Sequence, residues 1–285
     1  MESLLSILEK TTIFFQKYKV PNARLDAELM LAHVLKCNRM QLYLDFERPV
    51  LEEALEKLRP MMKRRAQREP LQYILGEVDF RGIELKVDSR ALIPRPETEE
   101  LVDWILENHS SQSVNSILDL GTGTGAIPCA LAAEFKAAEI LAVDYSADAL
   151  SLARENVESL GLNDRIQLLR SDWFSDVEGE FDVVVSNPPY LSDEEYDDTA
   201  PELLRYEPRM ALTSGKSGLE AIERIISQSS DHLKTDGSLY LETGINQNEA
   251  IVEIVNRLGG LTVQFRKDLA GKDRFCRIRN SSNRN

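Results

Sequence analysis

The sequence has few cysteines, no long apolar run and no recognisable metal-ligand motif. Its three cysteines, Cys37, Cys129 and Cys276, form no C-x-x-C pair, which argues against a disulfide framework or a zinc site and favours a reducing compartment. No run of about 18 apolar residues predicts a membrane span. The first ten residues lack a basic segment and a cleavage site, so we expect no signal peptide. From the cysteine pattern we expect a cytoplasmic location and no bound metal.

The chain also lacks the positive charge of a typical DNA-binding protein. Its formal net charge is −14. Residues 1–80 hold 13 Lys and Arg against 12 Asp and Glu, whereas residues 81–285 hold 21 against 36. Neutralising many phosphates requires a basic surface, so we expect no stable DNA binding. The near-neutral first part and the acidic remainder are expected to face different partners.

Residues 1–76 have apolar side chains at helical spacing and no strand-like alternation. We predict a small all-α bundle here, with a long helix from Glu52 to Arg68. That helix carries a basic cluster, which we interpret either as a solvated face or as a docking surface for a protein partner. The cluster comprises Lys57, Arg59, Lys63, Arg64, Arg65 and Arg68.

After Gly76 the apolar period changes to two, and Arg81-Gly82 lies between two short alternating runs. This pattern predicts a β-hairpin linker over residues 77–91. From Ser116 onwards, short apolar runs alternate with amphipathic helices, which predicts an α/β fold with a mostly parallel, seven-stranded sheet covered on both faces. The expected strands are Ser116–Leu120, Glu139–Asp144, Arg165–Leu169, Phe181–Ser186, Gly237–Glu242, Leu261–Arg266 and Asp273–Arg279.

A glycine-rich loop follows the first strand of the predicted sheet. Leu120 runs directly into Gly121-Thr122-Gly123-Thr124-Gly125, where the chain can turn sharply and a ligand can touch backbone without meeting a Cβ. Ligands of open α/β sheets bind at the carboxyl ends of the strands. Asp144 ends the next strand, where a carboxylate can accept hydrogen bonds from ribose hydroxyls. The loop therefore predicts a cofactor that contains a nucleoside.

These residues leave two cofactors open. Gly121, Gly123 and Ala126 also satisfy the dinucleotide fingerprint, which a nicotinamide-dependent oxidoreductase would use. Such an enzyme needs a proton donor beside its substrate. None is suggested by the three histidines, which we interpret as surface or helix residues: His33, His109 and His232. Asp172 and Trp173 offer an acceptor and a ring for an adenine base, which favours S-adenosyl-L-methionine.

The fourth predicted strand ends at Asn187-Pro188-Pro189-Tyr190. Both prolines lack an N–H and have φ restricted to about −65°, and a proline also holds the residue before it in extended geometry. The Asn187 side chain and the Pro188 carbonyl then form two aimed acceptors beside the Tyr190 ring. The segment is suited to a planar amide or amino group, although so short a match also fits a strand that merely ends in prolines.

The glycine loop and this tetrapeptide resemble class I S-adenosylmethionine-dependent methyltransferases that modify a planar nitrogen. Two groups share the tetrapeptide, namely N6-adenine and N4-cytosine DNA methyltransferases and the peptide chain release factor N5-glutamine methyltransferases. Further segments across nearly the whole chain are similar to the second group. They are Arg24–Glu28, Arg65–Gly76, Leu92–Glu99 and Tyr206-Glu207-Pro208. Ser217 departs from that family's pattern, which usually has an acid there.

The resemblance implies a role for each site residue. Gly121, Thr122, Gly123, Thr124 and Gly125 line the cofactor together with Asn187, while Asp144 takes its ribose and Asp172 and Trp173 flank its adenine. Asn187 and Pro188 accept hydrogen bonds from the substrate amide, Tyr190 packs on its plane and Pro189 shapes the wall. The implied reaction methylates the glutamine of a Gly-Gly-Gln motif in release factors, giving N5-methylglutamine and S-adenosyl-L-homocysteine.

We therefore predict three parts and a monomer: a helical domain over 1–76 that recognises the release factor, a linker over 77–91 and a Rossmann-like methyltransferase domain over 92–285. Three alternatives remain. A DNA adenine methyltransferase is disfavoured by the acidic second part and by the absence of a basic target-recognition insertion. An oxidoreductase is disfavoured by the missing proton donor, and a non-catalytic binding module by the intact loop and tetrapeptide.

Overall fold

The computed structural model describes residues 2–281 and divides into two compact units. The helical unit contains the residues through Glu77 together with 200–206, and the sheet unit contains 78–199 and 207 onwards. Nothing in the sequence pattern signals that the chain enters the helical unit a second time. No helix within residues 2–281 has both the length and the apolar character needed to cross a membrane.

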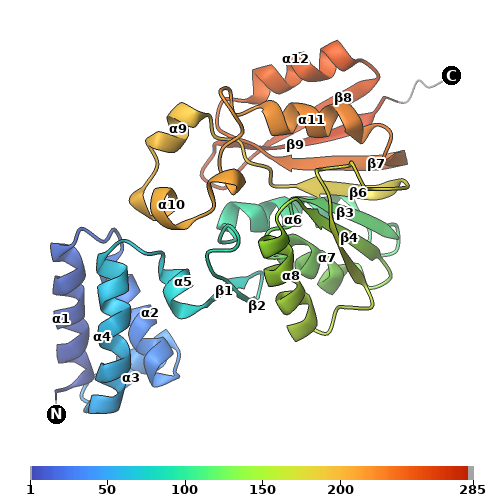
Figure 1. The fold of residues 1–285 in the computed structure, drawn as a ribbon. Coiled ribbons are helices and arrows are strands. Elements are labelled where there is room, and N and C mark those ends of the chain that lie inside the picture. The colour runs from blue at the N-terminus through green and yellow to red at the C-terminus, as the bar shows by residue number, and fades with distance from the viewer. Residues whose placement is uncertain (1, 282–285) are drawn as a thin grey trace. The chain divides into compact units, whose positions relative to one another are not determined.

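The helical unit is the predicted bundle (Figure 1). Its helices are α1 (Leu4–Lys17), α2 (Ala23–Leu35), α3 (Arg39–Leu44), α4 (Glu52–Ala66), α5 (Leu71–Leu75) and the returning α10 (Pro201–Tyr206). Leu8, Phe15 and Met30 form its core and are fully buried. Helix α4 starts where predicted but stops two residues before Arg68. Arg68 adopts a left-handed φ of 71°, which an α-helix cannot include.

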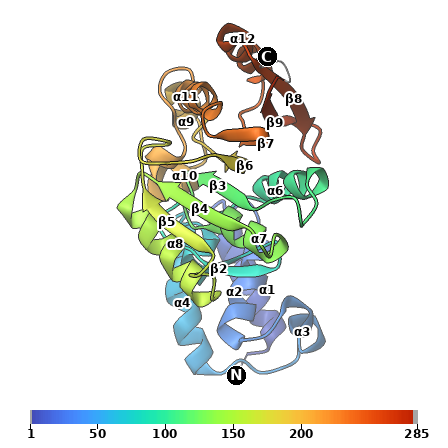
Figure 2. The ribbon, with the colours of Figure 1, turned by 90° about the vertical axis from the view of Figure 1, so that its right-hand side faces the viewer.

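The predicted hairpin and the seven-stranded sheet are both confirmed. Strands β1 (Glu77–Phe80) and β2 (Ile83–Lys86) pair around Arg81-Gly82. The sheet order is β5-β4-β3-β6-β7-β9-β8, and β9 runs antiparallel to both of its neighbours (Figure 2). These strands are β3 (Ser116–Leu120), β4 (Glu139–Asp144), β5 (Ile166–Arg170), β6 (Phe181–Ser186), β7 (Leu233–Glu242), β8 (Leu261–Lys267) and β9 (Asp273–Asn280).

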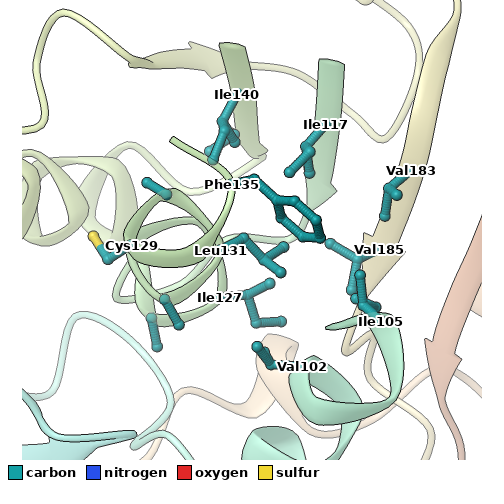
Figure 3. Packing of buried hydrophobic residues seen from close by; sticks show 14 of the residues in the cluster. Val102, Ile105, Ile117, Ile127, Cys129, Leu131, Phe135, Ile140, Val183 and Val185 are labelled. Atoms are coloured by element: carbon teal, nitrogen blue, oxygen red, sulfur yellow. The ribbon is translucent and has the colours of Figure 1, made fainter. Parts of the chain in front are cut away.

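Helices cover both faces of this sheet. They are α6 (Pro96–Asn108), α7 (Ala126–Glu134), α8 (Ala147–Ser159), α11 (Glu220–Ser229) and α12 (Asn248–Leu258). On one face Phe135, which directly follows α7, packs among buried residues of β3 and β6 such as Ile117 and Val183 (Figure 3). Leu118 points to the opposite face and packs with α11 and α12. The alternation of Ile117 and Leu118 follows from the two-residue period of a strand.

Strand β7 begins four residues before the predicted start at Gly237. Its pairing with β6 is interrupted between Phe181 and Val183, so Leu233 pairs beyond a bulge. A Cβ on Gly237 would lie 2.7 Å from the Phe181 carbonyl oxygen, closer than real Cβ atoms approach. Gly237 thus marks the bulge inside the strand rather than the start of the strand.

The register of the sheet brings three loops together. Leu120 on β3 is paired with Val143 on β4 and with Ser186 on β6. The next residue of each strand, which is Gly121, Asp144 or Asn187, therefore leaves the same edge of the sheet. The chain moves outwards from β3 to β4 and β5, and then crosses to β6 on the other side of β3. Such a reversal of strand order forms a crevice for ligands.

Candidate active site

A cavity of about 380 Å³ lies at this edge of the sheet unit. Residues 121–124 of the glycine loop, Asp144, Trp173 and Asn187 line it at the strand ends, whereas Gly125 is not among the lining residues. Its other walls are residues 90–95, ahead of α6, and Pro208, Met210 and Ala211, the last two of which lie in the short helix η1 (Arg209–Ala211). The structure therefore brings together loops that are about 120 residues apart in the sequence.

The glycine loop is held by the acid at the end of β4. Asp144 accepts hydrogen bonds from the N–H groups of Gly123 and Ser146, each at 2.9 Å. Burial raises the pKa of Asp144, and these backbone hydrogen bonds counteract part of that shift. A carboxylate has about four lone-pair positions. Asp144 can therefore accept a further hydrogen bond, and its contact with ribose hydroxyls stays a prediction.

The loop needs glycine at its first and last positions because of its backbone geometry. Gly121 and Gly125 have φ values of 76° and 80°, which residues with a Cβ rarely adopt. A Cβ on Gly121 would also lie 3.6 Å from the Trp173 ring. The loop thus packs closely against Trp173.

Trp173 and Asp172 both line the cavity. Trp173 itself has a left-handed φ of 55°, a strained conformation for an aromatic residue and a type of strain that clusters at functional sites. One oxygen of Asp172 pairs with Arg224 at 2.8 Å. Since this ion pair occupies only one oxygen, the other remains available as an acceptor for a base.

Two buried polar side chains at the start of the loop lack a well-formed hydrogen bond within residues 2–281. They are Asp119, at both carboxylate oxygens, and Thr122, at its hydroxyl oxygen, although the Thr122 side chain lies close enough to lower the pKa of Asp119 against the effect of burial. Burial raises the pKa of Asp119 to about 7. Leaving buried polar groups unpaired is costly and requires an explanation. A cationic ligand that also carries hydroxyl groups would satisfy them.

S-Adenosyl-L-methionine fits this set of residues. It carries an ammonium, a sulfonium, a ribose and an adenine, and the cavity lining offers acids in Asp144 and Asp172 and a ring in Trp173. Asp119 is a further acid that lies buried directly before the glycine loop. The cavity volume lies within the range of ligand sites, about 300–1,000 Å³. No group of acids, histidines and cysteines within residues 2–281 could hold a metal ion.

On the other side of the cavity, the side chain of Asn187 begins a buried hydrogen-bond chain. Its Nδ2 donates to Thr98 Oγ1 at 3.0 Å, and Thr98 Oγ1 donates to Glu242 Oε2 at 2.7 Å. The Tyr190 hydroxyl donates to the other oxygen of Glu242 at 3.2 Å. Burial raises the pKa of Glu242 to about 7. The chain fixes the plane of the Asn187 amide.

The residues of the tetrapeptide occupy different positions. Asn187 and Pro189 line the cavity, whereas Pro188 is buried and Tyr190 is half-buried, and neither is among the lining residues. The Tyr190 carbonyl accepts a hydrogen bond from Gln247 at 3.0 Å. A Cβ on Gly218 would lie 2.4 Å from the same oxygen, so only glycine lets the two segments approach this closely.

None of the three histidines is among the residues that line the cavity. His109 contacts the Tyr240 hydroxyl at 3.0 Å, and burial lowers its pKa to about 4. His33 pairs with Glu77, and His232 contacts the Gly179 carbonyl. These contacts account for all three side chains.

Three residues of the site were not predicted from the sequence, namely Thr98, Asp119 and Glu242. Asp119 and Glu242 share a signal, because each is an acid that directly follows a buried apolar run, Ile117-Leu118 in β3 and Leu239-Tyr240-Leu241 in β7. Burying a charged group is costly, so such an acid indicates a site. Thr98 has no comparable signal, since a threonine early in a helix is ordinary.

Comparisons with known proteins agree with the fold. Residues 6–76 match the PrmC N-terminal domain, and residues 98–216 match the Methyltransferase small domain. The chain is 39% identical over 280 residues to a release factor glutamine methyltransferase of Rhodopirellula baltica, covering 96% of this chain and 95% of that protein. It is 36% identical over 299 residues to the MTRF1L release factor glutamine methyltransferase of Homo sapiens, covering 99% and 88%.

Among solved structures, the hMettl16 catalytic domain in complex with MAT2A 3'UTR hairpin 6 is similar in fold. The TM-score is 0.59 at 20% identity, and the match covers 79% of this chain and 83% of that one. Identity this low supports the fold but not a shared substrate.

Proposed function

Since the chain belongs to the release factor glutamine methyltransferase family, we propose that it methylates the side-chain amide nitrogen of a glutamine in a translation release factor. It is a protein-glutamine methyltransferase, and its cofactor is S-adenosyl-L-methionine. The proposed target is the glutamine of the Gly-Gly-Gln motif and the product is N5-methylglutamine. The observation that carries this proposal is the oriented amide of Asn187, which lines the same cavity as the glycine loop.

The bound cofactor supplies an electrophilic methyl group on a positively charged sulfur. We infer that Asp119, Asp144, Trp173 and the loop from Gly121 to Gly125 hold it. Their contribution is to fix the cofactor in one position, because Asp144 is hydrogen-bonded to the loop backbone and Trp173 packs against it. Asp172 is the proposed acceptor for the adenine amino group.

The substrate amide is a weak nucleophile because its lone pair is delocalised into the carbonyl. Asn187 Nδ2 is committed to Thr98, so Oδ1 is the atom left to accept an N–H of the substrate. The Pro188 carbonyl is the proposed second acceptor. When both N–H bonds are held, the nitrogen lone pair is directed at the electrophile. Both hydrogen bonds strengthen as the nitrogen becomes cationic, which stabilises the transition state selectively.

Positioning accounts for much of the proposed rate enhancement. Holding two reactants in the reactive geometry can supply about 7–11 kcal/mol. Tyr190 is proposed to pack on the plane of the substrate amide, and Pro189 to form the adjoining wall. The proton leaves the product nitrogen for water after the transfer.

We infer that the helical unit recognises the release factor. One observation that supports this inference is the match of residues 6–76 to the PrmC N-terminal domain. The other is that two apolar side chains on α3 are available for contact with a protein, since Met40 is 70% and Leu44 is 77% exposed. The basic cluster offers less free charge than its composition indicates. Arg59 pairs with Glu52, Arg64 with Glu69, and Arg65 is buried. We expect a monomer and no stable complex with DNA.

The proposal is tested by following a labelled methyl group. The protein is incubated with methyl-labelled S-adenosyl-L-methionine and, in separate reactions, an intact release factor, the same factor with its motif glutamine changed to alanine, and duplex DNA. We expect label on the intact factor alone, located at that glutamine by mass spectrometry. Label on the alanine-substituted factor or on DNA would contradict the proposed target.

A further inference from the structure

The Asn187 amide is linked to a carboxylate that cannot touch the substrate nitrogen. The carboxylate is Glu242, at the end of β7, and the link is Thr98, in the first turn of α6. Glu242 is 1% exposed and Thr98 is 4% exposed. The two hydrogen bonds of the link are 3.0 Å and 2.7 Å long. Such a buried chain is well shielded from water, so each proton in it has a defined direction.

The direction follows from counting protons. An ionised carboxylate only accepts hydrogen bonds, and a hydroxyl has one proton to donate. Thr98 must therefore donate to Glu242, which leaves only its lone pairs for Asn187. Only the NH₂ side of the Asn187 amide can donate to those lone pairs. Oδ1 is then turned away from Thr98, on the side where an acceptor is needed.

We propose that Thr98 and Glu242 are positioning residues that keep the Asn187 amide in its accepting orientation. The inference rests on the proposed function, because the orientation matters only if Oδ1 accepts an N–H of the substrate. Tyr190 is aligned by the same carboxylate through its hydroxyl. Glu242 thus controls two groups of the tetrapeptide at once, although it belongs to a different strand, β7.

Protonation of Glu242 removes the constraint on the orientation of the Asn187 amide. The protonated acid can donate to Thr98, which frees the Thr98 proton to donate to Asn187 Oδ1. The amide can then rotate by about 180° and present its NH₂ group to the substrate, where an acceptor is required. The orientation is therefore tied to the ionised form of Glu242.

The groups that face Glu242 come from three other elements. They are Thr98 and Glu97 on α6, Tyr190 after β6 and Arg274 on β9. Arg274 lies over the Tyr190 ring at 5.9 Å and donates to the Thr243 carbonyl, so it favours the ionised form without contacting the carboxylate directly. Glu97 opposes ionisation, and burial opposes it most. With a pKa of about 7, Glu242 changes its charge near neutral pH.

The first test compares two substitutions at Thr98. Thr98→Val keeps the shape of the side chain but removes the hydroxyl, and Thr98→Ser keeps the hydroxyl. We expect Thr98→Val to lower kcat by about 10- to 100-fold, because a small misplacement near the reacting atoms has costs of this size. Thr98→Ser should restore most of kcat. Cofactor affinity, measured by calorimetry, should stay within a few-fold in both variants.

Ser229→Ala is the matched control. Ser229 on α11 is also fully buried in the sheet unit and donates to a backbone carbonyl, but it does not line the cavity. Its loss should leave kcat unchanged. A fall in kcat equal to that of Thr98→Val would assign the effect to the general loss of a buried hydroxyl and overturn the proposal.

The second test uses the pH profile of kcat at saturating cofactor. In the wild type kcat should fall as the pH decreases through about 7, because the ionised form is the active one. Glu242→Gln cannot ionise, so its lower kcat should lose this inflection. An unchanged kcat and profile in both Thr98→Val and Glu242→Gln would overturn the proposal. Failure of the proposed function would look different, since the wild type itself would then not methylate a release factor.

Discussion

Each unit contains a glutamate that is 1% exposed, but the hydrogen-bond donors to the two carboxylates differ in charge. In the helical unit, the Glu28 carboxylate accepts hydrogen bonds from Arg24, from Arg39 and from the Tyr43 hydroxyl. Burial opposes its ionisation, but these hydrogen bonds outweigh burial and lower its pKa. In the sheet unit, the two donors to Glu242 within residues 2–281 are the hydroxyls of Thr98 and Tyr190, and burial raises the pKa of Glu242 to about 7.

The difference shows how to tell a structural acid from a functional one. A buried acid with an arginine partner has its charge compensated, so removing the partner should cost stability. A buried acid without a direct cation partner costs stability in the folded state and is retained for its chemistry. Asp26, which pairs with Arg65, belongs to the first kind, although burial outweighs this pairing and raises its pKa, and Asp119 belongs to the second.

The largest expected effect is on the stability of the helical unit. Arg65 pairs with Asp26 at 2.7 Å and with Glu202 of α10 at 3.0 Å, and its side chain is 7% exposed. Arg65→Ala leaves buried carboxylates without this partner, so the unit should lose about 3–5 kcal/mol. Amide hydrogen exchange of α2 and α4 measures the change.

Lys63 provides the control for that substitution. It carries the same charge on the same helix but is exposed. Lys63→Ala should change stability by less than about 0.5 kcal/mol. Equal losses at the two positions would mean that burial does not distinguish these charges, and Arg65 could again be interpreted as part of a docking surface.

In the sheet unit the largest effect should be on turnover. Asn187→Ala removes the proposed acceptor Oδ1, and kcat should fall by about 10²–10³-fold, as for other groups that stabilise a developing charge. Cofactor affinity should remain within a few-fold, because the glycine loop is untouched. Near wild-type turnover in a single-turnover assay would exclude this role for Asn187.

A smaller effect is expected for the acid that holds the loop. Asp144→Ala removes the acceptor of the Gly123 and Ser146 N–H groups and the proposed ribose contact. The dissociation constant for S-adenosyl-L-methionine should rise by about 10- to 100-fold, because this is the cost of losing one or two hydrogen bonds to a charged group. Calorimetry measures this directly, and unchanged affinity would place the ribose elsewhere.

The smallest expected effect is a gain in stability on substituting Asp119, whereas the changes above are all losses. The pKa of Asp119 is raised from 3.8 to about 7, so between these values the unfolded chain loses this proton before the folded chain does. The free energy of unfolding should therefore fall as the pH rises through this window. Asp119→Asn avoids the buried charge and should be more stable than the wild type at pH 8 by about 1–2 kcal/mol.

The same comparison at low pH serves as the control for Asp119→Asn. Below the pKa of the unfolded aspartate both proteins are neutral at this position, so the difference in thermal unfolding should disappear. The variant should also bind the cofactor more weakly at pH 8. A variant that is destabilised equally at both pH values would show that Asp119 has a structural role.

The sequence predicted most of the sheet because buried parallel strands and their glycine turns are local patterns. Six of the seven strands begin within one residue of their predicted start, and the exception is the bulge at Gly237. The same local signals predicted Gly121, Asp144 and Asn187 at strand ends, and all three line one cavity. The re-entry of α10 into the helical unit was not predicted, because ion pairs between residues about 135 positions apart leave no local pattern.

The sequence by itself therefore determined which strand ends carry the glycine loop and the planar-amide segment, since backbone restrictions of glycine and proline act within a few residues. It did not determine what orients Asn187 or which acids remain without a cation. Those features depend on side chains from α6, β3 and β7 that meet only after folding. Only the tertiary structure removes these groups from water, and that burial raises the pKa of Asp119 and of Glu242.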